Sequence, residues 1–164
     1  MEKVSGLSNR YILRTLKKLK VSHLFTGVYS SDTVDVPLLK EKEEYICIVN
    51  LSKKTHPGSH FVTVIGTKKL TLYADSLALP SSLSPQLHKS LQSLGKKISP
   101  LNSRPIQAPH SVFCGFFAIF YCIFFDYIRF PLIKGQKTFL KNDLHKNDTI
   151  CLQNIKEIIK SNPV

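Results

Sequence analysis

Apolar and basic positions interleave at helical spacing near the start of the chain. Ile12, Leu16 and Leu19 recur at i, i+4 and i+7, and basic residues stand between them (Arg14, Lys17, Lys18 and Lys20). This spacing gathers the apolar side chains on one helix face, and Ser8 or Asn9 could cap the start. We predict a basic amphipathic helix, whose charged face is either simply solvated or part of a nucleic-acid surface.

The pattern then changes to that of β-strands. Residues 45–49 form an uninterrupted apolar run, which predicts a buried strand. Two β-prone runs, Phe61–Ile65 and Leu70–Ala74, are joined by the short Gly-containing link Gly66–Lys69, which predicts a hairpin. The segment Val28–Lys42 mixes Ser, Asp, Pro and charged residues, so we predict a loop there.

Helical spacing returns in the second half of the chain. Ser84 and Pro85 suit an N-cap and a first turn, Gly95 suits the end, and leucines recur between them (Leu87, Leu91 and Leu94). The stretch Lys96–Pro109 is rich in Pro and basic residues and shows no periodic pattern. A final helix is predicted over Thr149–Lys160, with three isoleucines facing inward (Ile155, Ile158 and Ile159).

The most apolar stretch runs from Val112 to Phe125. It has 14 residues, whereas a membrane-spanning helix needs about 20. We therefore predict a buried core helix that Pro131 ends, and no contact with a membrane.

Length and composition indicate one domain over residues 1–164. The chain has 164 residues, 43% of them hydrophobic, which suffices for a core without disulfides. Its four cysteines form no CxxC pair and no histidine stands at zinc-ligand spacing, so we expect no metal site. Nothing at the N-terminus resembles a signal peptide. We expect an intracellular, monomeric protein with reduced thiols.

The net charge is strongly positive. Lys and Arg number 23 against 11 Asp and Glu, a formal charge of +12. Such a charge attracts polyanions, so nucleic acid is one candidate partner, and a generally basic soluble surface is the alternative.

The predicted hairpin brings a histidine and a carboxylate together. If Ile65 pairs with Leu70, the antiparallel register sets His60 directly opposite Asp75. Opposed side chains share a face, with Cβ atoms ~5 Å apart. A carboxylate there could accept the imidazole N–H and stabilise the imidazolium. The alternative is an ordinary strand-edge histidine and an aspartate that forms a turn before Ser76.

Cys114 stands at the predicted start of the apolar helix, followed by Gly115. The positive end of a helix dipole stabilises a thiolate, and a neighbouring histidine would ready it for attack near neutral pH. Cysteine is also a common buried apolar residue. That interpretation applies to Cys47, Cys122 and Cys151, each of which lies inside an apolar segment.

Acyl transfer also needs donors for a developing oxyanion. Gln107 lies seven residues before Cys114, and Pro105 and Pro109 stiffen the approach. Its side-chain amide could reach back beside the helix start, where the backbone N–H of Cys114 would be the second donor. Taken alone, a loop glutamine is an ordinary surface residue.

Three segments carry these residues in order: Gly58–Val62, Tyr73–Leu77 and Gln107–Phe116. Together they resemble the adenovirus protease family, adenain and its relatives in viruses and large DNA transposons, within the wider group that includes SUMO-deconjugating proteases. The interval from Gln107 to Cys114 is like adenain, and Tyr73–Leu77 is more like the deconjugating branch. The resemblance covers about Leu13 to Ile128.

The resemblance implies an α+β, papain-like or adenain-like fold, in which a central helix bearing the cysteine packs on a mixed sheet bearing the histidine and acid. It implies Cys114 as the nucleophile, His60 as general base and then acid, Asp75 as the third member and Gln107 in the oxyanion hole. Family substrates pass through a narrow cleft that admits glycine, so cleavage at Gly-containing sites is expected.

The sequence departs from the family pattern at several positions. Phe61 stands where the family usually has Trp, and Asp75 where adenain has Glu. Adenain's peptide activator docks through a disulfide to a cysteine between the acid and the glutamine, but no cysteine lies between Asp75 and Cys114 here. We therefore expect no disulfide-linked activator and no cofactor required for the chemistry, with stimulation by DNA compatible with the charge.

Three functions follow from these features. The main hypothesis is a cysteine endopeptidase that matures viral or mobile-element precursor proteins, located in the virion or host nucleus if viral. The alternative is a ubiquitin- or SUMO-like deconjugating protease with the same residues. The third is a non-enzymatic, basic nucleic-acid-binding module whose apparent triad is coincidental.

Overall fold

The computed structural model of the chain describes residues 6–19, 23–56, 59–128 and 142–161. Its centre is a five-stranded mixed sheet in the order β1-β2-β3-β4-β5. The middle strands form an antiparallel meander, and each edge strand pairs in parallel with its neighbour. The strands are β1 (Phe25–Ser30), β2 (Tyr45–Asn50), β3 (Phe61–Gly66), β4 (Leu70–Ala74) and β5 (Lys97–Pro100).

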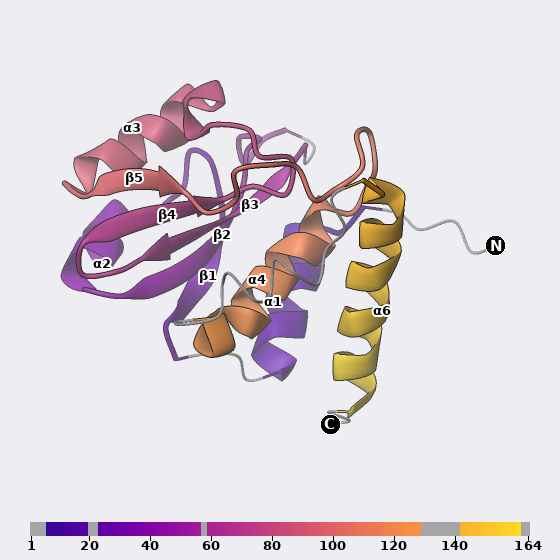
Figure 1. Cartoon of the computed structure of the whole chain (residues 1–164). Coiled ribbons are helices and arrows are strands. Elements are labelled where there is room, and N and C mark those ends of the chain that lie inside the picture. The colour runs from indigo at the N-terminus through magenta and orange to yellow at the C-terminus, as the bar shows by residue number, and fades with distance from the viewer. Residues whose placement is uncertain (1–5, 20–22, 57–58, 129–141, 162–164) are drawn as a thin grey trace.

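Helices cover both faces of this sheet (Figure 1). One layer holds α1 (Asn9–Lys18), α4 (Cys114–Ile128) and α6 (Leu144–Ser161), and the other holds α2 (Val36–Glu41) and α3 (Pro85–Ser93). A 3₁₀ turn, η1 (Ser81–Leu83), precedes α3. The predicted α+β class, with a central helix packed on a mixed sheet, is confirmed.

Alternating side chains of the central strands divide the core in two. Ile46 and Ile48 face α1, α4 and α6, whereas Cys47 and Val49 face α2 and α3. Every residue of β2 and β3 is buried, as expected for strands covered on both faces. The hydroxyl of Thr63 also donates to the carbonyl of Ala118 at 3.3 Å, which ties β3 to α4.

The predicted N-terminal helix is present as α1. Ser8 is the N-cap, because its hydroxyl accepts from the backbone N–H of Tyr11 at 3.2 Å. Ile12 and Leu16 are fully buried, and Arg14, Lys17 and Lys18 are exposed. Lys20 lies outside the described residues. The predicted amphipathic pattern therefore holds.

The predicted apolar helix is present as α4, which begins at Cys114, in agreement with the predicted helix start. About two turns of it, from Phe116 to Cys122, are buried. Among the described residues, no helix is both long enough and apolar enough to cross a membrane.

The predicted hairpin register is wrong by two residues. Ile65 pairs with Leu72, not with Leu70, and Gly66 pairs with Thr71. The backbone pairing continues one residue past β3, because the N–H of Thr67 donates to the carbonyl of Leu70 at 2.8 Å. The Thr67 hydroxyl accepts from the N–H of Leu70 at 3.0 Å. These bonds close a tighter turn than the link Gly66–Lys69 that we predicted.

A shift of two residues leaves side chains on the face they would otherwise have occupied. Asp75 therefore stays on the side of the hairpin that carries His60. The two residues are diagonal neighbours, not directly opposed, and this separation is within reach of long side chains.

The predicted loop Val28–Lys42 is also wrong, because it contains the second half of β1 and all of α2. The carboxylate of Asp35 caps α2 by accepting from the N–H of Leu38 at 3.0 Å. The stretch Lys96–Pro109 likewise contains β5. Both strands lie at sheet edges and are only partly buried, so neither carries the apolar pattern of a central strand.

The final helix begins earlier than predicted, at Leu144 rather than Thr149. Asp143 precedes it and accepts from the backbone N–H of Lys146 at 2.9 Å, as an N-cap does. Ile155 is buried, and Ile159 packs against the core only in part. The predicted end of the preceding helix at Pro131 lies outside the described residues.

Substituting Gly66 should destabilise the fold. A Cβ added there would lie 2.1 Å from Cε1 of Tyr45, and Tyr45 is 1% exposed. Forcing that ring to move should lower the free energy of unfolding of Gly66→Ala by about 1–3 kcal/mol or more, as measured by urea denaturation. In a double-mutant cycle, Tyr45→Leu should relieve part of this loss. A Gly66→Ala protein as stable as wild type would contradict the packing.

Candidate active site

The residues of interest meet at one end of the sheet. His60 directly precedes β3, and Asp75 directly follows β4. Because these strands are antiparallel, the start of one lies beside the end of the other. Cys114 is the first residue of α4, which packs on the same two strands. The topology thus brings together side chains that are up to 54 positions apart in the chain.

His60 and Asp75 are hydrogen-bonded. Nε2 of His60 lies 2.8 Å from Oδ1 of Asp75, and the two side chains are 14% and 1% exposed. The same Oδ1 accepts from the backbone N–H of Leu77 at 2.7 Å. The side-chain amide of Asn102 donates to the backbone carbonyl of Asp75. Two donors therefore hold Oδ1 of the carboxylate, Asn102 fixes the backbone of Asp75, and the predicted pair is present.

The surroundings of His60 favour its charged form. Burial alone would lower the pKa of the imidazole, but the hydrogen bonds with Asp75 and with Cys114, together with their charges, raise it from 6.5 to about 9. Since Nε2 is used by Asp75, Nδ1 is the nitrogen that remains for Cys114. An imidazolium that bridges a carboxylate and a thiol can exist at neutral pH.

The charge on His60 should make stability depend on pH. The folded pKa of about 9 exceeds the ordinary value of 6.5, so the stabilisation is fully present below pH 6.5 and is lost as pH rises through about 9. We expect wild type to be more stable than His60→Gln at pH 6, by on the order of 2–3 kcal/mol. Most of this difference should vanish at pH 10, as measured by urea denaturation at each pH. A constant difference would show that His60 is not charged in the folded state.

Cys114 differs from the other cysteines in its exposure. It is partly exposed, whereas Cys47, Cys122 and Cys151 are buried, and all four are free. Burial raises the pKa of Cys47 to about 12 and raises the pKa of Cys122 and Cys151 well above the ordinary value. As predicted, the first turn of a helix carries the accessible thiol and the core holds the rest.

Gln107 is 1% exposed and lies in the loop between β5 and α4. Its Oε1 accepts from the hydroxyl of Ser76 at 2.5 Å. Its Nε2 donates to the carbonyl and to the hydroxyl of Ser111, each at 3.0 Å. The amide N–H₂ group is thus held against Ser111, three residues before Cys114, and an oxyanion at Cys114 would have to share one of these hydrogens.

The sequence analysis did not find the residues that support Asp75. Asn102 is 4% exposed, and its Oδ1 accepts from the hydroxyl of Tyr121 at 3.3 Å. Tyr121 is seven residues after Cys114, two turns along the same face of α4. A buried tyrosine at that spacing is the one signal that could have indicated a polar partner beside the site.

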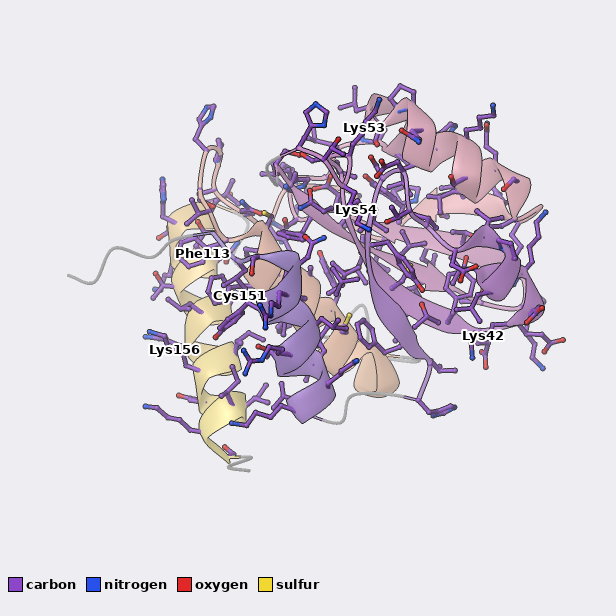
Figure 2. The ribbon with its side chains drawn as sticks, turned by 180° about the vertical axis from the view of Figure 1, so that it is seen from behind. Lys42, Lys53, Lys54, Phe113, Cys151 and Lys156 are labelled. Atoms are coloured by element: carbon purple, nitrogen blue, oxygen red, sulfur yellow. The ribbon has the colours of Figure 1, made fainter. Side chains whose placement is uncertain are left out.

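A cleft of about 490 Å³ opens beside Cys114. One wall is the loop between β2 and β3, which carries Lys53 and Lys54; Figure 2 labels both lysines. The other wall includes Val112 and the N-terminal segment 6–9. Leu7 approaches the start of α4 closely, since a Cβ added to Gly115 would lie 3.0 Å from Cβ of Leu7.

A second groove, of about 860 Å³, lies along α1 and reaches Ile159 of α6. Its lining is strongly basic and includes Arg10, Arg14, Lys17 and Lys18. Over the part of the chain that the structure describes, no group of three or more His, Cys, Asp or Glu side chains is placed to hold a metal ion.

Comparison with solved structures identifies the fold. Two structures of the Chlamydia trachomatis effector protein ChlaDUB1 each align with a TM-score of 0.51. The first is 13% identical, and the alignment covers 97% of this chain and 76% of the ChlaDUB1 chain. The second is 14% identical, and the alignment covers 99% of this chain and 85% of the ChlaDUB1 chain. No protein-family model matches the sequence, and no curated protein matches it.

The chain therefore has the α+β fold of the two ChlaDUB1 structures, with a central helix packed on a mixed sheet. The site lies where that fold places the start of its central helix against the sheet.

Proposed function

We propose that the protein is a cysteine protease in which Cys114 is the nucleophile, His60 the general base and acid, and Asp75 the residue that orients His60. The observation that carries this proposal is the imidazole of His60, hydrogen-bonded through Nε2 to Asp75 at 2.8 Å and also hydrogen-bonded to Cys114 at the start of α4. This is the nucleophile, base and orienting group that covalent catalysis requires.

The reaction would proceed in two stages. The thiolate of Cys114 adds to the scissile carbonyl carbon, and the oxyanion that forms is stabilised by the amide of Gln107 and the backbone N–H of Cys114. The imidazolium of His60 gives its proton to the departing amine, which leaves a thioester on Cys114. His60 then takes a proton from water, hydroxide adds to the thioester, and the thiolate is released with the acid product.

We propose ubiquitin-like conjugates as the substrate class. The name ChlaDUB1 designates a deubiquitinating effector, and its fold is shared here. The segment Tyr73–Leu77 resembles the deconjugating branch, and Asp75 is the acid usual in that branch. These features favour hydrolysis of the bond that follows the C-terminal glycine of a modifier.

The second candidate is a maturation endopeptidase of viral or mobile-element precursors. It is supported by the adenain-like interval from Gln107 to Cys114 and by the compact length of 164 residues. Both candidates use the same reactive groups, so they differ in what enters the cleft.

A panel of probes can separate the two candidates. Recombinant protein would be incubated with ubiquitin-like modifiers that carry a C-terminal electrophile, and separately with a library of Gly-Gly peptides. An adduct on Cys114 with one modifier supports the deconjugating function, whereas peptide cleavage without any adduct supports the endopeptidase. No adduct, no cleavage and an unreactive thiol together would favour the non-enzymatic module.

We also propose that DNA binds the basic groove along α1. The exposed side chains of Arg10, Arg14, Lys17 and Lys18 line this groove and suit a phosphate backbone. Affinity for duplex DNA should fall steeply with salt and weaken in Arg14→Glu. Binding that is independent of salt would contradict this partner.

A further inference from the structure

A chain of hydrogen bonds joins α6 to the side chain of Gln107. Asp148, on α6, is 3% exposed, and its Oδ1 accepts from the backbone N–H of Ala108 at 3.2 Å. The carboxylate also accepts a hydrogen bond from the side chain of Ser111. Ser111 in turn accepts from Nε2 of Gln107 at 3.0 Å. Of the residues joined by these hydrogen bonds, only Gln107 takes part in the mechanism above.

The chemistry of these groups fixes the direction of each bond. A carboxylate only accepts, so the hydroxyl of Ser111 must give its hydrogen to Asp148. The oxygen of that hydroxyl is then left to accept from Gln107. At the other end of the amide, the hydroxyl of Ser76 donates to Oε1 of Gln107 at 2.5 Å. If the amide of Gln107 were turned over, its Oε1 would face the carbonyl and hydroxyl oxygens of Ser111, which are both acceptors here.

Asp148 is placed by a firmly packed helix. Cys151 and Ile155, three and seven residues further along α6, are 0% and 1% exposed and share the core with α4. These positions lie on the same helix face as Asp148. The loop that Asp148 holds is tightly turned, since His110 has a left-handed φ of 60°. The backbone N–H of Ser111 donates to the carbonyl of Ala108 at 3.3 Å.

The pKa of Asp148 reflects both its burial and its hydrogen bonds to the loop. Burial raises the pKa of its carboxyl group, and the hydrogen bonds from Ala108 and Ser111 and the charge of His145 oppose that rise. The loop's hydrogen bonds therefore stabilise the charged form of the Asp148 carboxylate, and the carboxylate in turn holds the loop in place.

We propose that Asp148 is a positioning residue for amide hydrolysis: by fixing the direction of the Ser111 hydroxyl, it keeps the N–H₂ group of Gln107 turned toward the loop that precedes Cys114. This inference rests on the proposed function, in which Gln107 donates to the oxyanion. It assigns to α6 a part in catalysis without contact with the substrate.

Two reactions of Cys114 can test this role. Amide hydrolysis forms an oxyanion, whereas alkylation by iodoacetamide only displaces iodide at carbon as the sulfur–carbon bond forms. In Asp148→Ala we expect kcat for the wild-type substrate to fall about 10- to 100-fold. KM and the rate of alkylation should each stay within about two-fold, since neither depends on the oxyanion. Ser111→Ala should also lower kcat, whereas Ser111→Thr, which keeps the hydroxyl, should have a kcat close to that of the wild type.

Glu157→Ala is the matched control, because Glu157 is an exposed carboxylate on the same helix. It should leave kcat unchanged. An unchanged kcat in Asp148→Ala would overturn the proposal, and so would a parallel loss of alkylation, because that result would indicate general damage to the site.

A measurement without substrate separates this inference from the proposed function. If the wild-type protein hydrolyses no probe, the proposed function fails, but the side-chain amide of Gln107 can still be followed by NMR. Its two Nε2 hydrogens should shift and exchange faster with water in Asp148→Ala and stay unchanged in Glu157→Ala. Resonances that are unaffected by Asp148→Ala would overturn the role of Asp148 in holding the amide.

Discussion

Replacing Cys114 with alanine should lower hydrolysis by about 10⁴-fold or more, because the covalent route through a thioester is lost. The other three thiols cannot replace it, since they are buried. The fold should survive, because Cys114 is only partly buried at the end of a helix. Turnover of the substrate identified by the probe panel, together with circular dichroism, would check both statements.

Cys47→Ala is the control for this result. Cys47 is fully buried on the face of the sheet that packs against α2 and α3, away from α4. Its loss should reduce stability but leave the activity per folded molecule unchanged. Hydrolysis that survives in Cys114→Ala, or that disappears in Cys47→Ala while the protein stays folded, would show that the nucleophile is misassigned.

Replacing His60 with alanine should have the second-largest effect. In the proposed mechanism the imidazole carries the proton between the thiol, the leaving amine and water, so kcat should fall by about 10²–10⁴-fold. The vacated site is partly open to solvent, since His60 is 14% exposed, and added imidazole should restore part of the activity. The measurement is the dependence of kcat on imidazole concentration at fixed pH.

His88→Ala provides the matched control, because His88 lies on α3 and is hydrogen-bonded to Ser81 of η1 at 2.8 Å, away from Cys114. It should keep full activity and show no response to imidazole. If imidazole failed to rescue His60→Ala, or activated both variants equally, proton transfer by His60 would no longer be supported.

The sequence predicted the pairing of His60 with Asp75 for a reason that was only partly right. The predicted register was wrong by two residues, because Thr67 closes the turn with its own hydroxyl. An even error preserves the face of every side chain, so the pair formed nevertheless. An error of one residue would have separated the imidazole from the carboxylate.

The edge strands and the supports of the site were not predicted, for different physical reasons. β1 and β5 are edge strands with mixed burial, and their pairing depends on neighbours distant in sequence. Asn102 and Asp148 act only through contacts made after folding. A single polar residue in a loop or helix gives no local pattern that would reveal such a contact.

The close contact between Leu7 and Gly115 places the N-terminal segment in the wall of the cleft, apart from the elements that carry the reactive groups. The reactive groups belong to the sheet and to α4, but one wall of the cleft is the segment 6–9, which reaches that place because Gly115 has no side chain in the way. Under the proposed function, changes in residues 6–9 would reshape the cleft that substrate enters while the imidazole, carboxylate and thiol keep their positions. Substrate preference and chemical competence would then be encoded in different parts of this chain.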